Sequence, residues 1–397
     1  MFMSRAKARA ARKVEREAAV AVVKVLRLAA LLALLPGAVG AAILPDDRAD
    51  VMYHGYDGGG LEVSGPSVLV RKGFDEKVSV WANYYVDMIS SASIDVVATA
   101  SPYEETRNEY SGGVDYLHGK TLMGLSYTNS TEDDYVADTV RFGISQDFFG
   151  DLITLGISYA VGNDEVLRNG DPAFEEHTDR QTYRVDLSQI VTPSMVVNFG
   201  YEGVTDEGFL HNPYRSARYT DPSSSKGYSY EAEVSPGTKT SSAWALRSMY
   251  YLPYRASARA EYRYYTDTWG VDAWNIELGY VQPLPKGLTL DVSYRYYTQT
   301  AADFYSDLYP RQNSQNFLSR DKELSSFSSN TLGVGVSYAF DTRLIPFFKR
   351  GEFSVFANYL LIDYDDFRDV LKSGAPGDEP LYQLDSTILR AYLSVWY

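Results

Sequence analysis

The chain has 397 residues, of which 45% are hydrophobic and 14% aromatic, and its formal net charge is −15. Beyond the amino-terminal region no apolar run is long enough for a membrane-spanning helix, so a bundle of membrane helices is excluded. The acidic balance argues against a nucleic-acid partner. The chain contains no cysteine, which excludes disulfides, a lipoprotein anchor, thiolate metal sites and covalently attached c-type haem.

The first predicted element is a secretory signal peptide over residues 1–40. Basic residues between Arg5 and Arg16 precede an apolar stretch at 28–35 and small residues at 38–42, which is the order found in signal sequences. We expect cleavage at about residues 40–42. Residues 1–40 hold eight basic and two acidic residues, so their removal changes the formal net charge from −15 to −21. Such an acidic mature chain, 41–397, suits loops that meet divalent cations at a lipopolysaccharide surface.

The mature chain alternates apolar and polar residues in segments of about ten residues, the length that a tilted strand needs to cross a bilayer. Residues 255–267, for example, place arginines and a glutamate on one face and alanines and tyrosines on the other. Fifteen such segments lie between 61 and 397, and 50–56 with the turn at 57–60 supplies another. The sequence predicts an all-β fold, a transmembrane antiparallel up-and-down β-barrel of about 16 strands, with 14 as the alternative.

The links between these strands alternate between short and long, as do the periplasmic turns and external loops of outer-membrane barrels. Long external loops are expected near residues 88–106, 163–178, 205–240, 300–325 and 365–383. Within the first of them, 87–95 either folds inward as a constriction or belongs to an ordinary external loop with a short extra strand at 94–99, and we favour the loop. The last strand ends on Tyr397 and resembles the terminal signal read by the barrel-assembly machinery. These features predict a location in the bacterial outer membrane.

Function is expected on the face that points into the barrel, because inward residues control passage while outward residues contact lipid. In the predicted register the candidate lumen-lining residues are charged: Arg247, Arg255, Arg259, Glu261, Arg263, Glu277, Asp291 and Arg295. Two interpretations stay open. The charges form a selectivity zone for charged solutes, or they pair into a network that holds a filled or plugged lumen.

Catalytic and metal-binding patterns receive little support. The histidines at 54, 118, 177 and 211 lie in separate segments, without the spacing of a Ser-His-Asp triad or of a His-x-x-x-His pair. Acidic runs such as 132–134 and 363–366 lack the twelve-residue spacing of an EF-hand and are typical of solvated loops. We therefore expect no catalytic residues, no metal and no cofactor, although an embedded hydrolase with a site at the external rim stays open.

Four stretches of the chain, 53–60, 65–72, 83–96 and 143–151, resemble a proteobacterial outer-membrane family classed as a domain of unknown function, number 3570. The resemblance covers nearly all of the mature chain. It implies the barrel fold and the outer-membrane location but no substrate. It also implies that nearby genes encode a small lipoprotein, a thioredoxin-like protein and a flavin transferase that modifies exported proteins.

Three functions follow as hypotheses. The leading one is a porin-like passage or binding protein for a small solute or a partner protein. The alternative is a non-catalytic barrel scaffold in an extracytoplasmic redox assembly, with a flavin or haem carrier as its partner, and the third is a lipid-facing outer-membrane enzyme. The expected surroundings are outer-membrane lipid and lipopolysaccharide, with the barrel-assembly machinery acting during biogenesis and a periplasmic lipoprotein or redox carrier as a further partner.

Overall fold

The computed structural model describes residues 43–91, 93, 94, 98, 103–342 and 347–397. The signal peptide expected over residues 1–40 lies outside the described residues. In the part that is described, no helix is long and apolar enough to cross a membrane. The strands and short 3-10 helices are β1 (Arg48–Gly58), β2 (Leu61–Phe74), β3 (Val78–Ser91), β4 (Tyr103–His118), β5 (Thr121–Thr131), β6 (Tyr135–Phe148), β7 (Ile153–Leu167), β8 (Glu175–Thr192), β9 (Met195–Gly208), β10 (Ser216–Thr220), β11 (Tyr228–Ala232), β12 (Thr238–Tyr251), β13 (Ser257–Asp267), β14 (Asp272–Pro283), η1 (Pro285–Gly287), β15 (Leu288–Gln299), η2 (Lys322–Leu324), β16 (Phe327–Phe340), β17 (Arg350–Arg368) and β18 (Leu381–Trp396).

Sixteen of these strands form a closed antiparallel barrel, and β10 and β11 form a separate two-stranded sheet. Each barrel strand pairs with its neighbours in the chain, and β9 pairs with β12 because the β10–β11 hairpin is inserted between them. The first and last barrel strands close the ring, in a register from Arg48 opposite Trp396 to Gly58 opposite Ser386. Closure leaves the barrel without an unpaired strand edge. This is necessary in a bilayer, because lipid offers no hydrogen-bond partners to backbone groups. The predicted strand number and the predicted first strand are confirmed.

The alternation in sequence becomes the two surfaces of the barrel. On β16, Leu332, Val334 and Val336 are exposed on the outer surface, and in register Val334 lies opposite Val292 of β15. The residues between them, such as Gly333 and Gly335, belong to the lumen face. A contiguous band of exposed apolar side chains is what a hydrocarbon environment stabilises. The protein is an outer-membrane β-barrel.

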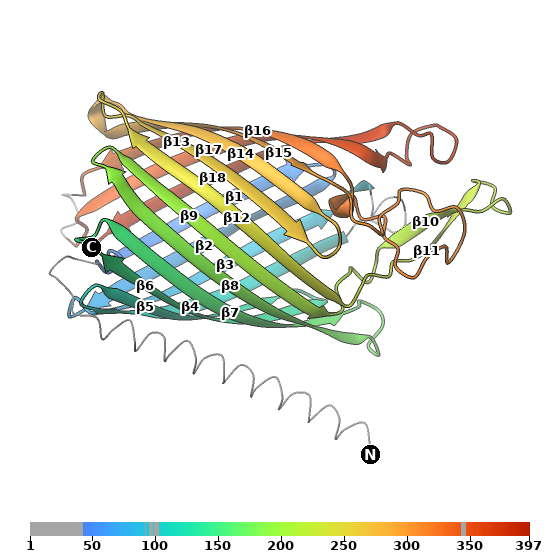
Figure 1. Cartoon of the computed structure of the whole chain (residues 1–397), viewed down its shortest axis with the longest axis horizontal. Coiled ribbons are helices and arrows are strands. Elements are labelled where there is room, and N and C mark those ends of the chain that lie inside the picture. Colours follow the sequence, from blue (N-terminus) through green and yellow to red (C-terminus); the bar gives the residue numbers. More distant parts are fainter. Residues whose placement is uncertain (1–42, 92, 95–97, 99–102, 343–346) are drawn as a thin grey trace, which may run out of the picture.

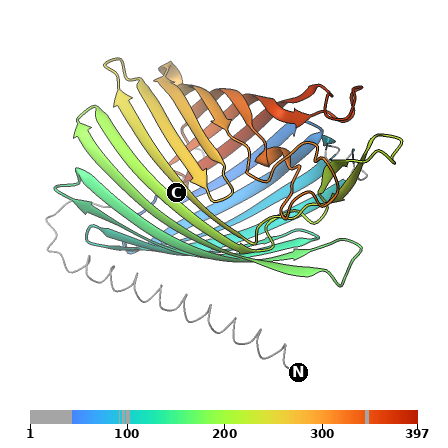
Figure 2. The same ribbon diagram turned by 45° about the vertical axis from the view of Figure 1, so that its right-hand side comes forward.

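The two ends of the barrel differ. Short turns and the carboxy terminus lie at one end, and the long loops and the β10–β11 hairpin extend from the other, as Figure 1 shows. The turned view in Figure 2 shows the same loops and hairpin extending from one end of the barrel. The strands continue further into the external loops than the sequence predicts, so that the link expected at 163–178 is reduced to 168–174 between β7 and β8. The short strand expected at 94–99 is wrong at the two positions described there. Ile94 and Ala98 are helical, and Ile94 packs in an apolar cluster with Phe367.

Three external segments fold into one body, which we call the cap: residues 209–237, 300–326 and 369–380. A small apolar cluster of Ala217, Tyr309 and Leu318 joins the first two segments. Backbone hydrogen bonds between Thr220 and Tyr309, and between Val234 and Leu318, add to this contact. The cap is therefore an ordered structure over the external end of the barrel.

Candidate functional site

Of the charged residues on the lumen face of neighbouring strands from β8 to β15, we call the following ten the lumen belt. They are Arg184, Asp186, Glu202, Arg247, Arg259, Glu261, Arg263, Glu277, Asp291 and Arg295. The register explains their alignment, because Arg247 lies opposite Glu261, Glu261 opposite Glu277, and Glu277 opposite Arg295. Five arginines face five carboxylates, so the belt carries no formal net charge.

The belt is held by ion pairs between strands. Arg247 pairs with Glu261, and Arg184 pairs with Glu202. Arg263 reaches the other oxygen of Glu202, with 3.8 Å between Nη2 and Oε1. Glu202 thus accepts a hydrogen bond from Arg184 and forms a longer ion pair with Arg263 of another strand.

Arg259 crosses an intervening strand to reach its partner. Its Nη1 and Nη2 donate to the two carboxylate oxygens of Asp291 at 2.8 and 3.0 Å. Between them lies Gly279 of β14, where a Cβ would overlap the Arg259 guanidinium. The glycine gives the arginine the space for a bidentate pair, the geometry in which Arg binds carboxylates most strongly.

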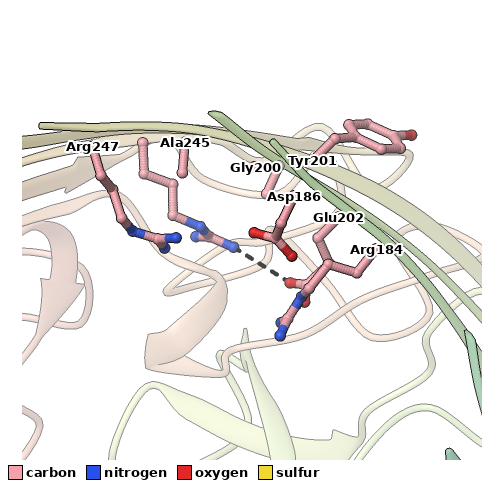
Figure 3. A pocket seen from close by; sticks show the side chains of 9 residues that line it. Arg184, Asp186, Gly200, Tyr201, Glu202, Ala245 and Arg247 are labelled. Carbon is pink, nitrogen blue, oxygen red and sulfur yellow. Dashed lines mark hydrogen bonds and ion pairs between the residues drawn. The ribbon is translucent and has the colours of Figure 1, made fainter. Parts of the chain in front are cut away.

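The belt is reached by solvent. Arg247 is 49% exposed, Arg184 42% and Arg263 33%, although all three face the lumen. A cavity of about 130 Å³ lies between them and is also lined by Asp186 and Glu202. Figure 3 shows Arg184, Asp186, Glu202 and Arg247 gathered around this cavity, while the ring of Tyr201 points away from it. This part of the barrel wall is therefore polar and hydrated.

Seven of the eight predicted lumen residues meet in the belt, and the eighth lies elsewhere. Arg255 is in the turn before β13, where its φ is 68° and its backbone N–H donates to Leu252. The prediction missed Arg184, Asp186 and Glu202. The signal was present, because these residues alternate with apolar ones along β8 and β9.

A second polar group lies on the lumen face of β1, β3 and β4. His54 Nε2 lies 2.7 Å from Asp87 Oδ1, and the hydroxyl of Tyr85 lies 3.1 Å from the same nitrogen. Arg107 donates to the other oxygen of Asp87 at 3.4 Å. Asp87 is the first residue of segment 87–95 and lies near the external end of β3. Its carboxylate is the group that His54 and Arg107 both contact.

At the external mouth, barrel and cap enclose a cavity of about 640 Å³. Its lining includes Glu105 of β4 with Glu132 and Asp134 of the β5–β6 turn. One oxygen from each of these carboxyl groups lies within 4.8 Å of the others. Burial, followed by repulsion from Glu105, raises the pKa of Glu132 above its usual value. The turn thus brings together part of an acidic run that the sequence presented as an ordinary loop.

The cap is held by a buried ion network at the centre of its three segments. Arg218 donates to Glu379 Oε1 at 2.6 Å and to Asp307 Oδ2 at 2.5 Å, and Arg320 donates to Asp307 Oδ1 at 3.0 Å. Burial alone would raise the pKa of Glu379, but the hydrogen bonds and charge of Arg218 lower the pKa below its usual value. These pairs fix the cap above the cavity.

Several solved outer-membrane structures are similar to the chain. A bacterial polysaccharide outer membrane secretin has 8% identity and a TM-score of 0.48, with 89% of this chain and all of that one covered. OmpT of Vibrio cholerae has 10% identity and a TM-score of 0.42, covering 88% and 98% of the two chains. The CymD monoaromatic hydrocarbon channel has 8% identity and a TM-score of 0.43, covering 89% of each. Among curated proteins no sequence matches.

A family model described as "Protein of unknown function (DUF3570)" matches residues 91–182 and 168–359, which include most barrel strands, the belt and much of the cap. The matched ranges span more than half of the chain. The chain therefore belongs to the DUF3570 family of outer-membrane β-barrels.

Proposed function

We propose that this barrel is a porin-like passage for small charged solutes, with the lumen belt as its selectivity zone. The observation that supports the proposal is the exposure of the belt. Arg247, Arg184 and Arg263 keep between a third and a half of their side-chain surface open to solvent, whereas charges that hold a packed plug are buried. Balanced charge on a hydrated wall lets ions enter without trapping them.

The belt has chemistry for orienting a solute. The guanidinium groups of Arg184, Arg247 and Arg263 converge on one cavity, and Glu202 and Asp186 face them. A solute that carries both an anionic and a cationic group finds partners of both signs there. The proposal gives the barrel no catalytic role. It takes outer-membrane lipid and lipopolysaccharide as the surroundings and the barrel-assembly machinery as the apparatus of insertion.

Single-channel recording in a planar bilayer tests the proposal. We expect stable conductance steps from the refolded protein without its signal peptide. In the variant Arg259→Ala/Arg263→Ala, the two uncompensated carboxylates should raise the K⁺ over Cl⁻ permeability ratio at least about fivefold, because each unit charge at about 4 Å in water is worth about 1 kcal/mol. The reversal potential in a KCl gradient measures this ratio.

The matched control is Arg255→Ala, which removes an arginine of the neighbouring turn rather than of the belt. Its permeability ratio should equal that of the unmodified protein. A folded barrel that conducts no ions would contradict the proposal and would favour the scaffold of a redox assembly, whose lumen is closed or occupied by a partner.

A further inference from the structure

The external cavity has the size of a site for a small ligand. Its volume of about 640 Å³ falls in the range of about 300–1,000 Å³ that holds small organic ligands. Its walls come from strand ends of the barrel on one side and from the cap on the other. The two walls carry different chemistry.

The barrel wall of the cavity supplies negative charge that is poorly compensated. Glu105, Glu132 and Asp134 converge there. Within the described ranges, Arg107 is the one cation within 4.0 Å of these carboxylates, at 3.9 Å from Glu132. Burial raises the pKa of Glu132 most, and repulsion from Glu105 raises it further. A bound cation would relieve this repulsion.

Two aromatic side chains, those of Tyr103 and Tyr214, lie near the carboxylates. Tyr103, Tyr214 and Tyr230 line the same cavity, together with apolar groups such as Leu61 and Ile362. Tyr214 is hydrogen-bonded with Asp134, and burial with this carboxylate raises the pKa of Tyr214 to about 12, so its ring stays neutral. Rings next to carboxylates are the arrangement that recognises organic ammonium groups.

The positive residues of the cavity do not cancel its charge. Of the charged residues that line it, seven are acidic and three are basic. Two of the basic ones are engaged within the cap, because Arg215 pairs with Asp321 and Arg320 pairs with Asp307. The formal charge of the residues that line the cavity is therefore negative.

We propose that this external cavity binds a small organic cation with an aromatic or aliphatic body, and that this cation is a solute of the passage. The ammonium group lies between Glu105, Glu132 and Asp134, and its body packs on the tyrosines and apolar groups of the walls. The inference rests on the proposed function for the step after binding, in which the cation moves on to the belt.

Calorimetric titration of the purified barrel with benzyltrimethylammonium chloride tests the binding site. Sodium benzoate, with a similar ring and the opposite charge, is the comparison ligand. We expect the cation to bind at least about tenfold more tightly than benzoate. The variant Glu105→Gln/Glu132→Gln should lose at least about tenfold in affinity for the cation, and Glu352→Gln, the same change at the periplasmic end of β17, should lose none.

Three results would overturn the inference: equal affinity for benzoate, unchanged affinity in the double variant, or binding of CaCl₂ alone without binding of the organic cation, which would make this a metal site. Each variant is first checked for a heat-modifiable band on a gel, so that misfolding is recognised. KCl conductance of the same samples separates the two proposals. If the barrel conducts ions but does not bind the cation, the cavity site is rejected and the passage function stands. If the barrel binds the cation but does not conduct ions, the passage function is rejected and the cavity site stands.

Discussion

Gly65 shows how one absent side chain sets the distance between two strands. A Cβ at this position would overlap the backbone carbonyl oxygen of Val86 on β3, and a backbone group cannot move aside as a flexible side chain can. Ten residues earlier, Gly55 has no atom within 4 Å of its Cβ position. The register places it next to Gly65, since Gly55 lies opposite Ser64. Two neighbouring glycines thus have different roles.

We expect Gly65→Ala to lower the free energy of unfolding by about 2 kcal/mol, because β2 and β3 must separate to admit the methyl group. Urea unfolding, followed by the loss of the heat-modifiable band, measures the change. Gly55→Ala is the control and should unfold at the urea concentration of the unmodified protein. Equal midpoints for the two variants would show that the close approach at Gly65 does not limit stability.

At the scale of the element, the cap depends on charges that are far apart in the chain. Arg218 is fully buried between Asp307 and Glu379, with the ring of Tyr228 5.0 Å from its guanidinium carbon. The removal of one member of a buried network leaves the others without compensation, which costs about 3–5 kcal/mol. Because the charged members of the network lie in the cap and hydrogen-bond to the barrel at Arg368, the last residue of β17, the cost should fall mainly on the cap.

The variant Arg218→Met should therefore unfold the cap while the barrel stays closed. Limited proteolysis of the folded protein should cut residues 300–326 faster than in the unmodified protein, and the heat-modifiable band should persist. Arg311→Met is the control, because Arg311 is exposed and donates to the backbone carbonyls of Gln312 and Asn313 in its own segment. Cleavage at the unmodified rate in Arg218→Met would mean that apolar contacts suffice to hold the cap.

At the scale of the whole molecule, stability depends on closure between β1 and β18. Deletion of residues 381–397 removes β18 and leaves β1 and β17 with unpaired edges, which a bilayer does not accommodate. The complete chain should migrate differently before and after boiling, and the truncated chain should migrate identically. A heat-modifiable band from the truncated chain would indicate that a smaller barrel closes without β18.

Much of this architecture could be predicted from sequence, because the alternation of faces within a strand is a local property. The strand number, the first strand at 50–56 and seven belt residues follow from that period. The prediction of Arg255 was wrong because a left-handed turn residue can continue the alternation without belonging to the strand. Glu202 was missed although it alternates with apolar residues along β9; the period could not predict its pairing with Arg263 of β13. The cap segments show no regular alternation of apolar and polar residues, so neither the ion network of the cap nor the cavity under it could be predicted.

The β10–β11 hairpin extends from the external end of the molecule (Figure 1), and its tip at 221–227 stands beyond the pairs that hold Arg218. The tip is closed by short-range bonds such as those from Ser223 and Ser229 to Asp221, so it needs little from the rest of the cap. A foreign peptide spliced between Ser225 and Lys226 would be presented to the medium on a rigid stalk. The barrel is thereby suited to carry an epitope on the surface of a living cell, where an antibody could label it without permeabilisation.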